Sequence, residues 1–181
     1  MTTDYITPQE ADELIAALPI EHSCIVIAAA ETGFRIGDLC KAKWSDYDLA
    51  ERTLTLREEK TGKQRTVTVP PRLEMALGSQ RKRQSMFEVY MFPGKPYHPV
   101  SRSTVWRWVV RTWEFLHKDD RRTISPHSFR KMYAVEQRKD GKELWEIQLD
   151  LNHERIDTTI KYAFADLLVI RAAEQKYQLM V

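Results

Sequence analysis

Cysteine is scarce in this sequence, and long apolar runs are missing altogether. The two cysteines, Cys24 and Cys40, form no C-x-x-C motif, which disfavours both a disulfide framework and a thiolate zinc site. No stretch approaches the ~18 consecutive apolar residues of a membrane span, and the first residues lack the basic start and apolar core of a signal peptide. We therefore expect a chain without a membrane span in a reduced, cytoplasmic compartment.

Internal repeats, low-complexity tracts and domain-dividing linkers are missing too. Of the 181 residues, 43% are hydrophobic and 30% are charged, which is typical of a globular protein and argues against disorder. We expect one domain over residues 1–181. The net charge of +2 alone says little about a nucleic-acid partner. Eight basic and only three acidic residues lie between Arg57 and Arg83, however, so the charge is polarised along the chain.

Capping residues and periodicity predict a fold that is mainly α with a small antiparallel β-sheet (α+β). Thr7 is a good helix N-cap, and Gly33 is expected to end a second, buried helix. Residues 52–70 alternate threonine with apolar residues on both sides of Thr61 and Gly62, which predicts a β-hairpin with a basic tip. Helices are expected over residues 6–19, 21–33, 35–42, 71–84, 103–118, 127–138, 142–153, 157–166 and 167–180, with a proline-rich connection over 90–101.

The segment "SPHSFRKM" places a histidine and an arginine one helical turn apart. His127 and Arg130 are three residues apart and therefore share a face of the predicted helix, just after Pro126. The start of a helix carries free backbone N–H groups and favours anions. A phosphate site is one explanation, but for this pair taken alone a solvated helix start is the favoured one.

A second arginine follows the turn at Gly33. Arg35 lies between apolar neighbours, where an arginine is costly unless it is paired or aimed at a ligand. Asp38, one turn later, is well placed to orient it. Taken alone, these two residues are also explained by a structural ion pair.

Two further groups of polar residues come from the hairpin and from the end of the chain. Lys60 and Lys63 flank the expected turn, and Arg65 lies on the returning strand. Lysines often decorate solvated hairpin tips, so the alternative to a phosphate-binding ammonium is a plain surface turn. His153 and Tyr162 lie in a short segment that is rich in threonine and polar before the tyrosine, which is unusual for a tyrosine of a packed core.

The ordered set of these residues resembles the tyrosine recombinase family, the phage-type integrases. The stretch "TGFRIGDL" looks like the first arginine box of the family, and "KTGKQR" falls where its catalytic hairpin lysine lies. "HSFR" matches the H-x-x-R box, and "LNHERIDTTIKYAF" is similar to the box that ends in the catalytic tyrosine. The resemblance runs from about Thr7 to Tyr162, and the combination of boxes is highly specific.

The resemblance implies the catalytic-domain fold of this family and DNA strand breakage and rejoining without a metal, ATP or another cofactor. Tyr162 would attack the scissile phosphate and leave a 3′-phosphotyrosyl link. A phenol has a pKa near ~10, so a neighbour must take its proton. Arg35 and Arg130 would stabilise the phosphate charge, Lys60 would protonate the leaving 5′ oxygen, His127 would move the proton of the tyrosine, and His153 would hydrogen-bond the phosphate. Asp38, Lys63, Arg65 and Lys131 are expected to support the site or to contact DNA.

Three positions depart from the usual pattern of the family. Asn152 replaces a glycine, which is a mild change because asparagine tolerates left-handed backbone. Asp38 stands where glutamate is commoner, and Lys131 where many members have histidine. The choice between Lys60 and Lys63 is left open because hairpin lengths vary.

The resemblance also implies partners and missing parts. Relatives carry an N-terminal helical domain that clamps DNA, so we expect this chain to be the catalytic domain of a truncated protein. Double-stranded DNA is the expected partner, with a monomer when free and a tetramer on DNA. The tail over residues 164–181 carries an apolar stripe and would dock either on a neighbouring protomer or on its own domain.

Three other functions are weighed against this one. The first is a type IB topoisomerase-like or telomere-resolving enzyme, which the small size and close box spacing disfavour. The second is a DNA-binding module with a decayed active site, which the presence of all six expected residue types disfavours. The third is a metal-dependent hydrolase, for which no H-E-x-x-H pattern is found. The DNA target, and whether the reaction integrates, excises or resolves, do not follow from the sequence.

Overall fold

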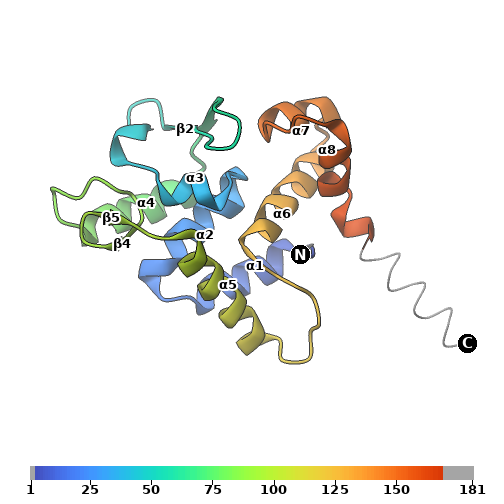
Figure 1. The fold of residues 1–181 in the computed structure, drawn as a ribbon, viewed down its shortest axis with the longest axis horizontal. Coiled ribbons are helices and arrows are strands. Elements are labelled where there is room, and N and C mark those ends of the chain that lie inside the picture. Colours follow the sequence, from blue (N-terminus) through green and yellow to red (C-terminus); the bar gives the residue numbers. More distant parts are fainter. Residues whose placement is uncertain (1–2, 169–181) are drawn as a thin grey trace, which may run out of the picture.

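The computed structural model describes residues 3–168 and confirms a mainly helical fold with a small antiparallel sheet (Figure 1). The helices are α1 (Pro8–Ala17), α2 (Ile20–Thr32), α3 (Ile36–Cys40), α4 (Pro71–Arg83), α5 (Arg102–Leu116), α6 (Pro126–Lys139), α7 (Leu144–Asp150) and α8 (Ile156–Ala163), with a 3₁₀ turn at Trp44–Asp46. The strands are β1 (Tyr47–Asp48), β2 (Thr53–Arg57), β3 (Gln64–Thr68), β4 (Pro93–Lys95) and β5 (His98–Pro99). None of the helices in this part of the chain is long and apolar enough to cross a membrane.

Helix α2 forms the centre of the main core. It is apolar nearly all round and contacts α1, α3, α4 and α6, so its residues from Cys24 to Ala30 are largely buried. Gly33 ends the helix with a left-handed backbone, φ 62°, as the sequence predicts. Thr7 caps α1 through a reciprocal capping box with Glu10, which fixes the start of the fold beside α2.

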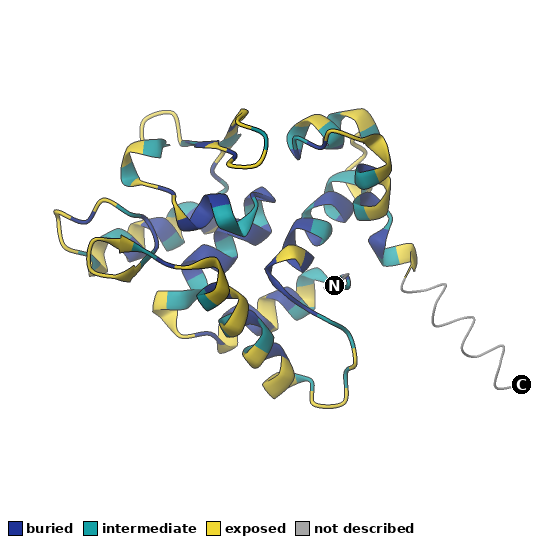
Figure 2. Cartoon of the chain, in the orientation of Figure 1, coloured by how far each residue is buried: buried dark blue, intermediate teal, exposed yellow. Residues whose placement is uncertain are grey.

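The predicted hairpin over residues 52–70 is confirmed as strands β2 and β3. Leu54 pairs with Val67 and Leu56 with Arg65, so one face of the hairpin points into the core. Strand β1 adds a short third strand beside β2, which was not predicted because two residues are too few to show an alternation. Figure 2 shows the loop tips of this region and the outer face of α5 as exposed.

The prediction of a plain proline-rich connection over residues 90–101 is wrong. Strands β4 and β5 form a separate two-stranded sheet there, with Pro93 opposite Pro99 and Lys95 opposite His98. Each strand of a two-stranded ribbon is an edge strand, where a proline without an N–H group removes no required ladder bond. The prolines that argued against strands are therefore compatible with this small sheet.

Helices α6, α7 and α8 pack together around a second, smaller core of Ala134, Ile147, Leu151 and Ala163. In Figure 1 the α7–α8 pair and the β2–β3 hairpin lie at the same edge of the molecule. Of the tail predicted over residues 164–181, Leu167 and Leu168 are exposed, and residues 169–181 lie outside the described part of the chain. The docking of the tail stays a prediction.

Candidate active site

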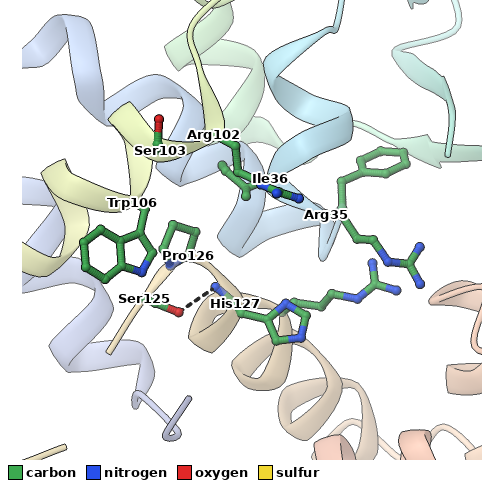
Figure 3. A pocket seen from close by; sticks show the side chains of 10 residues that line it. Arg35, Ile36, Arg102, Ser103, Trp106, Ser125, Pro126 and His127 are labelled. Carbon is green, nitrogen blue, oxygen red and sulfur yellow. Dashed lines mark hydrogen bonds between the residues drawn. The ribbon is translucent and has the colours of Figure 1, made fainter. Parts of the chain in front are cut away.

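Six side chains that the sequence singled out come from four parts of the fold and converge on one region. Arg35 is the N-cap of α3, Lys60 lies in the turn between β2 and β3, His127 and Arg130 occupy the first turns of α6, His153 precedes α8, and Tyr162 is in α8. Two open cavities of ≈ 340 and ≈ 770 Å³ adjoin here and share Arg35, Ile36, Arg102 and His127 in their walls. Figure 3 shows Arg35 and His127 at the smaller cavity, with Trp106 beside Pro126.

Tyr162 lies between two histidine rings. Its hydroxyl hydrogen-bonds Nε2 of His127, and the two rings meet edge to face with centroids 5.3 Å apart. The ring of His153 lies 4.9 Å from that of Tyr162, again nearly perpendicular. Nδ1 of His153 is 3.0 Å from the buried hydroxyl of Thr159, which fixes the imidazole and leaves its Nε2 for another partner.

Both imidazoles are neutral near pH 7. His153 is buried and His127 is exposed, but both rings lose water where they pack against the protein. This desolvation, followed by the positive charge of Arg130, lowers the pKa of His127 to about 4 and that of His153 to about 3. Burial raises the pKa of Tyr162, an effect that Arg130 and Arg35 partly oppose. A protonated phenol therefore faces a neutral imidazole, which is an arrangement in which the histidine can accept the proton of the tyrosine.

Arg130 is held by backbone carbonyls alone. The side chain is 1% exposed, and its Nη1 donates to the carbonyl of Gly33 over 2.6 Å while Nη2 donates to the carbonyl of Leu151. Burial and the nearby charges of Arg35 and Arg65 lower the pKa of this guanidinium to about 9. Carbonyls orient an arginine without neutralising it, so its charge is left available to an anion.

The close packing around Gly33 explains the glycine before the first arginine. A Cβ added there would lie 2.6 Å from Cδ1 of Tyr133, and φ is positive. The glycine thus lets its carbonyl reach Arg130. Asn152 also has a positive φ, 46°, which confirms the expectation of a left-handed backbone before His153.

The expectation that Asp38 orients Arg35 is wrong. The partner of Arg35 is Glu58, whose Oε2 forms an ion pair with Nη1, and among residues 3–168 no ion pair joins Arg35 to Asp38. Instead, Oδ1 of Asp38 accepts a hydrogen bond of 3.0 Å from the backbone N–H of Glu59. Asp38, in the short helix α3, therefore fixes the start of the hairpin turn and does not orient Arg35.

The position of the two hairpin lysines favours Lys60 as the lysine of the site. Both side chains are exposed, but only Lys60 lines the larger cavity together with Arg35 and His127. The turn is closed by hydrogen bonds from the N–H of Glu58 to the carbonyl of Lys63 and from the N–H of Gly62 to the carbonyl of Glu58. Lys63 is thus tied to the base of the turn through its backbone.

Arg65 and Lys131 lie around the site rather than in its cavities. Arg65 is buried, donates to the carbonyl of Thr32 over 2.6 Å, and lies over the ring of Phe34. It supports the site from inside and does not face DNA from this position. Lys131 is half-buried, and its Nζ donates to the carbonyl of Thr3, which ties the N-terminal segment to α6.

Sequence reasoning missed two buried polar residues, Glu58 and Thr159. Glu58 continues the alternation of Leu54 and Leu56, so the strand period places it on the inward face; a charged residue at that register was the available signal. Thr159 carried no comparable signal. Within residues 3–168, no group of three or more histidine, cysteine, aspartate or glutamate side chains could hold a metal ion.

The family described as "Phage integrase family" matches residues 4–167 of this chain. The chain is 28% identical to the tyrosine recombinase XerA of Pyrococcus furiosus over 97% of its own length and 62% of the relative. It is 30% identical to the tyrosine recombinase XerC of Xanthomonas campestris pv. campestris over 83% of its own length and 46% of the relative.

Solved structures agree with these matches. The crystal structure of a XerA recombinase superposes with a TM-score of 0.79 at 27% identity, covering 98% of this chain and 66% of that structure. A lambda integrase dimer bound to a COC′ core site gives a TM-score of 0.73 at 20% identity, covering 90% and 60%, and shows the shared fold. The chain therefore spans only about half to two thirds of the relatives that it matches.

Proposed function

Since this chain belongs to the phage integrase family, whose members include tyrosine recombinases, we propose that it cleaves and rejoins DNA strands site-specifically through a covalent phosphotyrosine. The observation that carries this proposal is the hydroxyl of Tyr162, hydrogen-bonded to the neutral His127 beside two arginines. Phosphoryl transfer needs little beyond a positioned nucleophile, a proton acceptor and fixed positive charge, and these three are present here.

In the proposed cleavage step, Oη of Tyr162 attacks the scissile phosphorus while Nε2 of His127 takes its proton. A phosphorus–Oη bond forms and the bond to the 5′ oxygen breaks, and Lys60 gives a proton to that oxygen. Arg35 and Arg130 stabilise the charge on the non-bridging oxygens, as fixed guanidiniums do without reorganisation. The free Nε2 of His153 donates a hydrogen bond to the same phosphate when that nitrogen carries the proton.

Rejoining is the reverse reaction with a second strand. The 5′ hydroxyl of that strand gives its proton to Lys60 and attacks the phosphorus of the 3′-phosphotyrosine. The bond from phosphorus to Oη of Tyr162 breaks, and His127 returns its proton to that oxygen. Because the covalent link stores the energy of the phosphodiester, the cycle requires neither ATP nor a metal or cofactor. Each step uses only groups that the structure brings within one region of the chain.

Double-stranded DNA is the proposed partner. The lambda integrase structure with this fold is a dimer bound to a core site, which supports a DNA-binding role for this chain. We further propose a monomer when free, a tetramer on DNA with the tail over 164–181 docking between protomers, and a cytoplasmic location.

The test is to trap the covalent intermediate. The protein is incubated with supercoiled plasmid and quenched in SDS, and mass spectrometry then searches for a nucleotide on Tyr162. We expect plasmid relaxation and an adduct on Tyr162, both lost in Tyr162→Phe because phenylalanine has no nucleophilic oxygen. Tyr97→Phe is the matched control, since Tyr97 is exposed and lines neither cavity of the site. Relaxation by Tyr162→Phe at the wild-type rate would overturn the assignment.

A further inference from the structure

We propose that Glu58 is a positioning residue of this active site: its buried carboxylate holds the guanidinium of Arg35 toward the phosphate and fixes the turn that carries Lys60. The inference rests on the proposed function and adds to it a residue that lies outside the four motif boxes. Glu58 lines neither cavity, so it acts through its neighbours and not by touching the substrate.

The burial of Glu58 needs an explanation. The residue is 0% exposed at the end of β2, on the inward face that also carries Leu54 and Leu56. A carboxylate in that position is destabilising unless it is paired and hydrogen-bonded. A leucine would fit the strand pattern at this register, so the fold alone does not call for a charge here.

The contacts of Glu58 connect the arginine to the lysine turn. Its Oε2 pairs with Nη1 of Arg35 and accepts a hydrogen bond of 3.0 Å from the hydroxyl of Thr61. Its backbone makes both hydrogen bonds that close the turn, with Lys63 and with Gly62. Lys60 lies inside this closed turn. Glu58 thus fixes the position of Arg35, which would bind the phosphate, relative to that of Lys60, which would donate the proton.

The direction of the ion pair indicates positioning rather than blocking. The side chain of Arg35 is 23% exposed and lines both cavities, whereas that of Glu58 is 0% exposed and lies behind it. Glu58 therefore grips Arg35 from the protein side, and the remaining donors of the guanidinium are left for the phosphate. An inhibitory carboxylate would instead occupy the cavity that the phosphate must enter.

Charge also distinguishes Glu58 from a purely structural residue. The charges of Arg35 and Arg65 act on Arg130, and the carboxylate of Glu58 acts on all three arginines. Asp38 acts on Arg35 and Arg130, and Asp150 acts on Arg65. Replacing Glu58 by glutamine removes one negative charge next to the phosphate site and keeps the shape. DNA should then bind more tightly, while the reaction slows because a neutral amide holds Arg35 less firmly than a carboxylate does.

The experiment compares Glu58→Gln with the wild type in two assays. Fluorescence anisotropy of a labelled random-sequence duplex measures affinity, and plasmid relaxation measures the rate. We expect about threefold to tenfold tighter binding and relaxation slower by about tenfold. Glu51→Gln is the matched control: it removes the same charge from an exposed residue of the turn before β2, which lines neither cavity. It should change neither quantity.

Tighter binding together with slower relaxation would distinguish a positioning residue from a purely structural one. Replacing a purely structural residue should weaken DNA binding and slow relaxation together. Faster relaxation by Glu58→Gln would overturn the proposal, because it would mean that the carboxylate blocks the site. Equal affinity for the Glu58 and Glu51 variants would overturn it as well. If the wild type relaxes no plasmid, the proposed function fails, whereas the affinity comparison still decides the role of Glu58.

A measurement on the wild type guards against a Glu58 variant that does not fold. In NMR spectra of the guanidinium groups, Arg35, assigned with Arg35→Lys, should show separate Nη signals because the ion pair slows rotation of the group. The separation should persist when duplex DNA is added. Averaged Nη signals in the free protein, or averaging that starts on DNA binding, would show that Glu58 does not hold Arg35.

Discussion

The two arginines of the site are held in different ways, and the difference divides the site into a helical half and a hairpin half. Arg130, in the helical half, is 1% exposed and is held by carbonyls of two distant segments, at Gly33 and Leu151. Arg35, at the hairpin half, is partly exposed and held by the carboxylate of Glu58. The helical half is thus defined by core packing, whereas the hairpin half is defined by charge and by the conformation of one turn.

This difference suits the chemistry proposed for each half. The helical half holds the proposed nucleophile, Tyr162, and its proposed proton acceptor, His127, and the distance of the nucleophile to the phosphorus would decide the rate. The hairpin half presents an exposed ammonium, which can follow the leaving oxygen as the bond breaks. Substitutions in the first half should therefore affect folding and rate together, and substitutions in the exposed turn should affect rate alone.

The largest expected effect is in the helical half, from Arg130→Ala. Loss of the guanidinium should slow plasmid relaxation by about a thousandfold or more, because a preorganised donor to the developing charge is removed. The carbonyls of Gly33 and Leu151 also lose their partner, so the melting temperature should fall. Arg121→Ala, in the exposed loop before α6, is the control and should leave both unchanged. A relaxation rate for Arg130→Ala within tenfold of the wild type would contradict the assigned role.

Gly33→Ala tests the packing that defines the same half. The new Cβ would meet the ring of Tyr133 at 2.6 Å in a backbone with positive φ, so the free energy of unfolding should fall by about 3 kcal/mol. Urea unfolding measures it. Gly78→Ala is the control: Gly78 lies inside α4 with open space around it, so alanine should stabilise by up to about 1 kcal/mol. Equal stability of the two variants would contradict the close packing at Gly33.

Lys60→Ala and Lys63→Ala test the hairpin half. We expect Lys60→Ala to slow relaxation by about a hundredfold, the usual contribution of a general acid. Lys63→Ala should leave the rate nearly unchanged, since Lys63 lies outside the cavity. Because both side chains are exposed, the free energy of unfolding, measured in urea, should change by less than about 0.5 kcal/mol in either variant. The reverse order of the two rates would make Lys63 the proton donor.

The smallest expected effect is the dependence of stability on pH, which arises from His153 in the helical half. The pKa of His153 is lowered from 6.5 to about 3, so the unfolded chain binds a proton at a higher pH than the folded chain does. This contribution to stability is fully present above pH 6.5 and is lost as the pH falls toward 3. Between pH 7 and pH 5 the loss should be about 2 kcal/mol.

Urea unfolding at several pH values measures this loss. In His153→Gln the dependence should flatten, whereas His98→Gln should keep it, because His98 is exposed in β5. The lowered pKa of His127 also makes the protein less stable as the pH falls. This contribution is smaller because the ring of His127 is exposed to solvent. A stability that rises on acidification would show that His153 is charged in the folded protein.

Local signals predicted most of the fold and most of the site. The capping box at Thr7, the left-handed glycine at position 33 and the alternation around Gly62 each act through neighbouring residues, so the sequence alone exposes them. The motif boxes likewise predicted which residues the fold would bring together. The sheet of β4 and β5 was missed because its prolines suit only edge strands, and that fact depends on the finished topology.

The partner of Arg35 was assigned to the wrong carboxylate for a similar reason. Asp38 is near Arg35 in sequence, whereas Glu58 reaches it only because β2 packs against α3. The choice between two carboxylates is a tertiary property, which local spacing does not determine. The register of the strand carried the one usable hint, since it pointed the charge of Glu58 into the core.

The carbonyl cage around Arg130 has a consequence for handling the protein. Neutral carbonyls supply no counter-ion, and the single carboxylate of Glu58 offsets only part of the charge of Arg35, Arg65 and Arg130, so the site should attract an anion from solution whenever DNA is absent. Compact divalent oxyanions such as sulfate and phosphate meet that demand better than chloride does. At matched ionic strength, buffers that contain them should compete with DNA at the site itself, and the choice of salt anion then becomes a variable of every binding experiment.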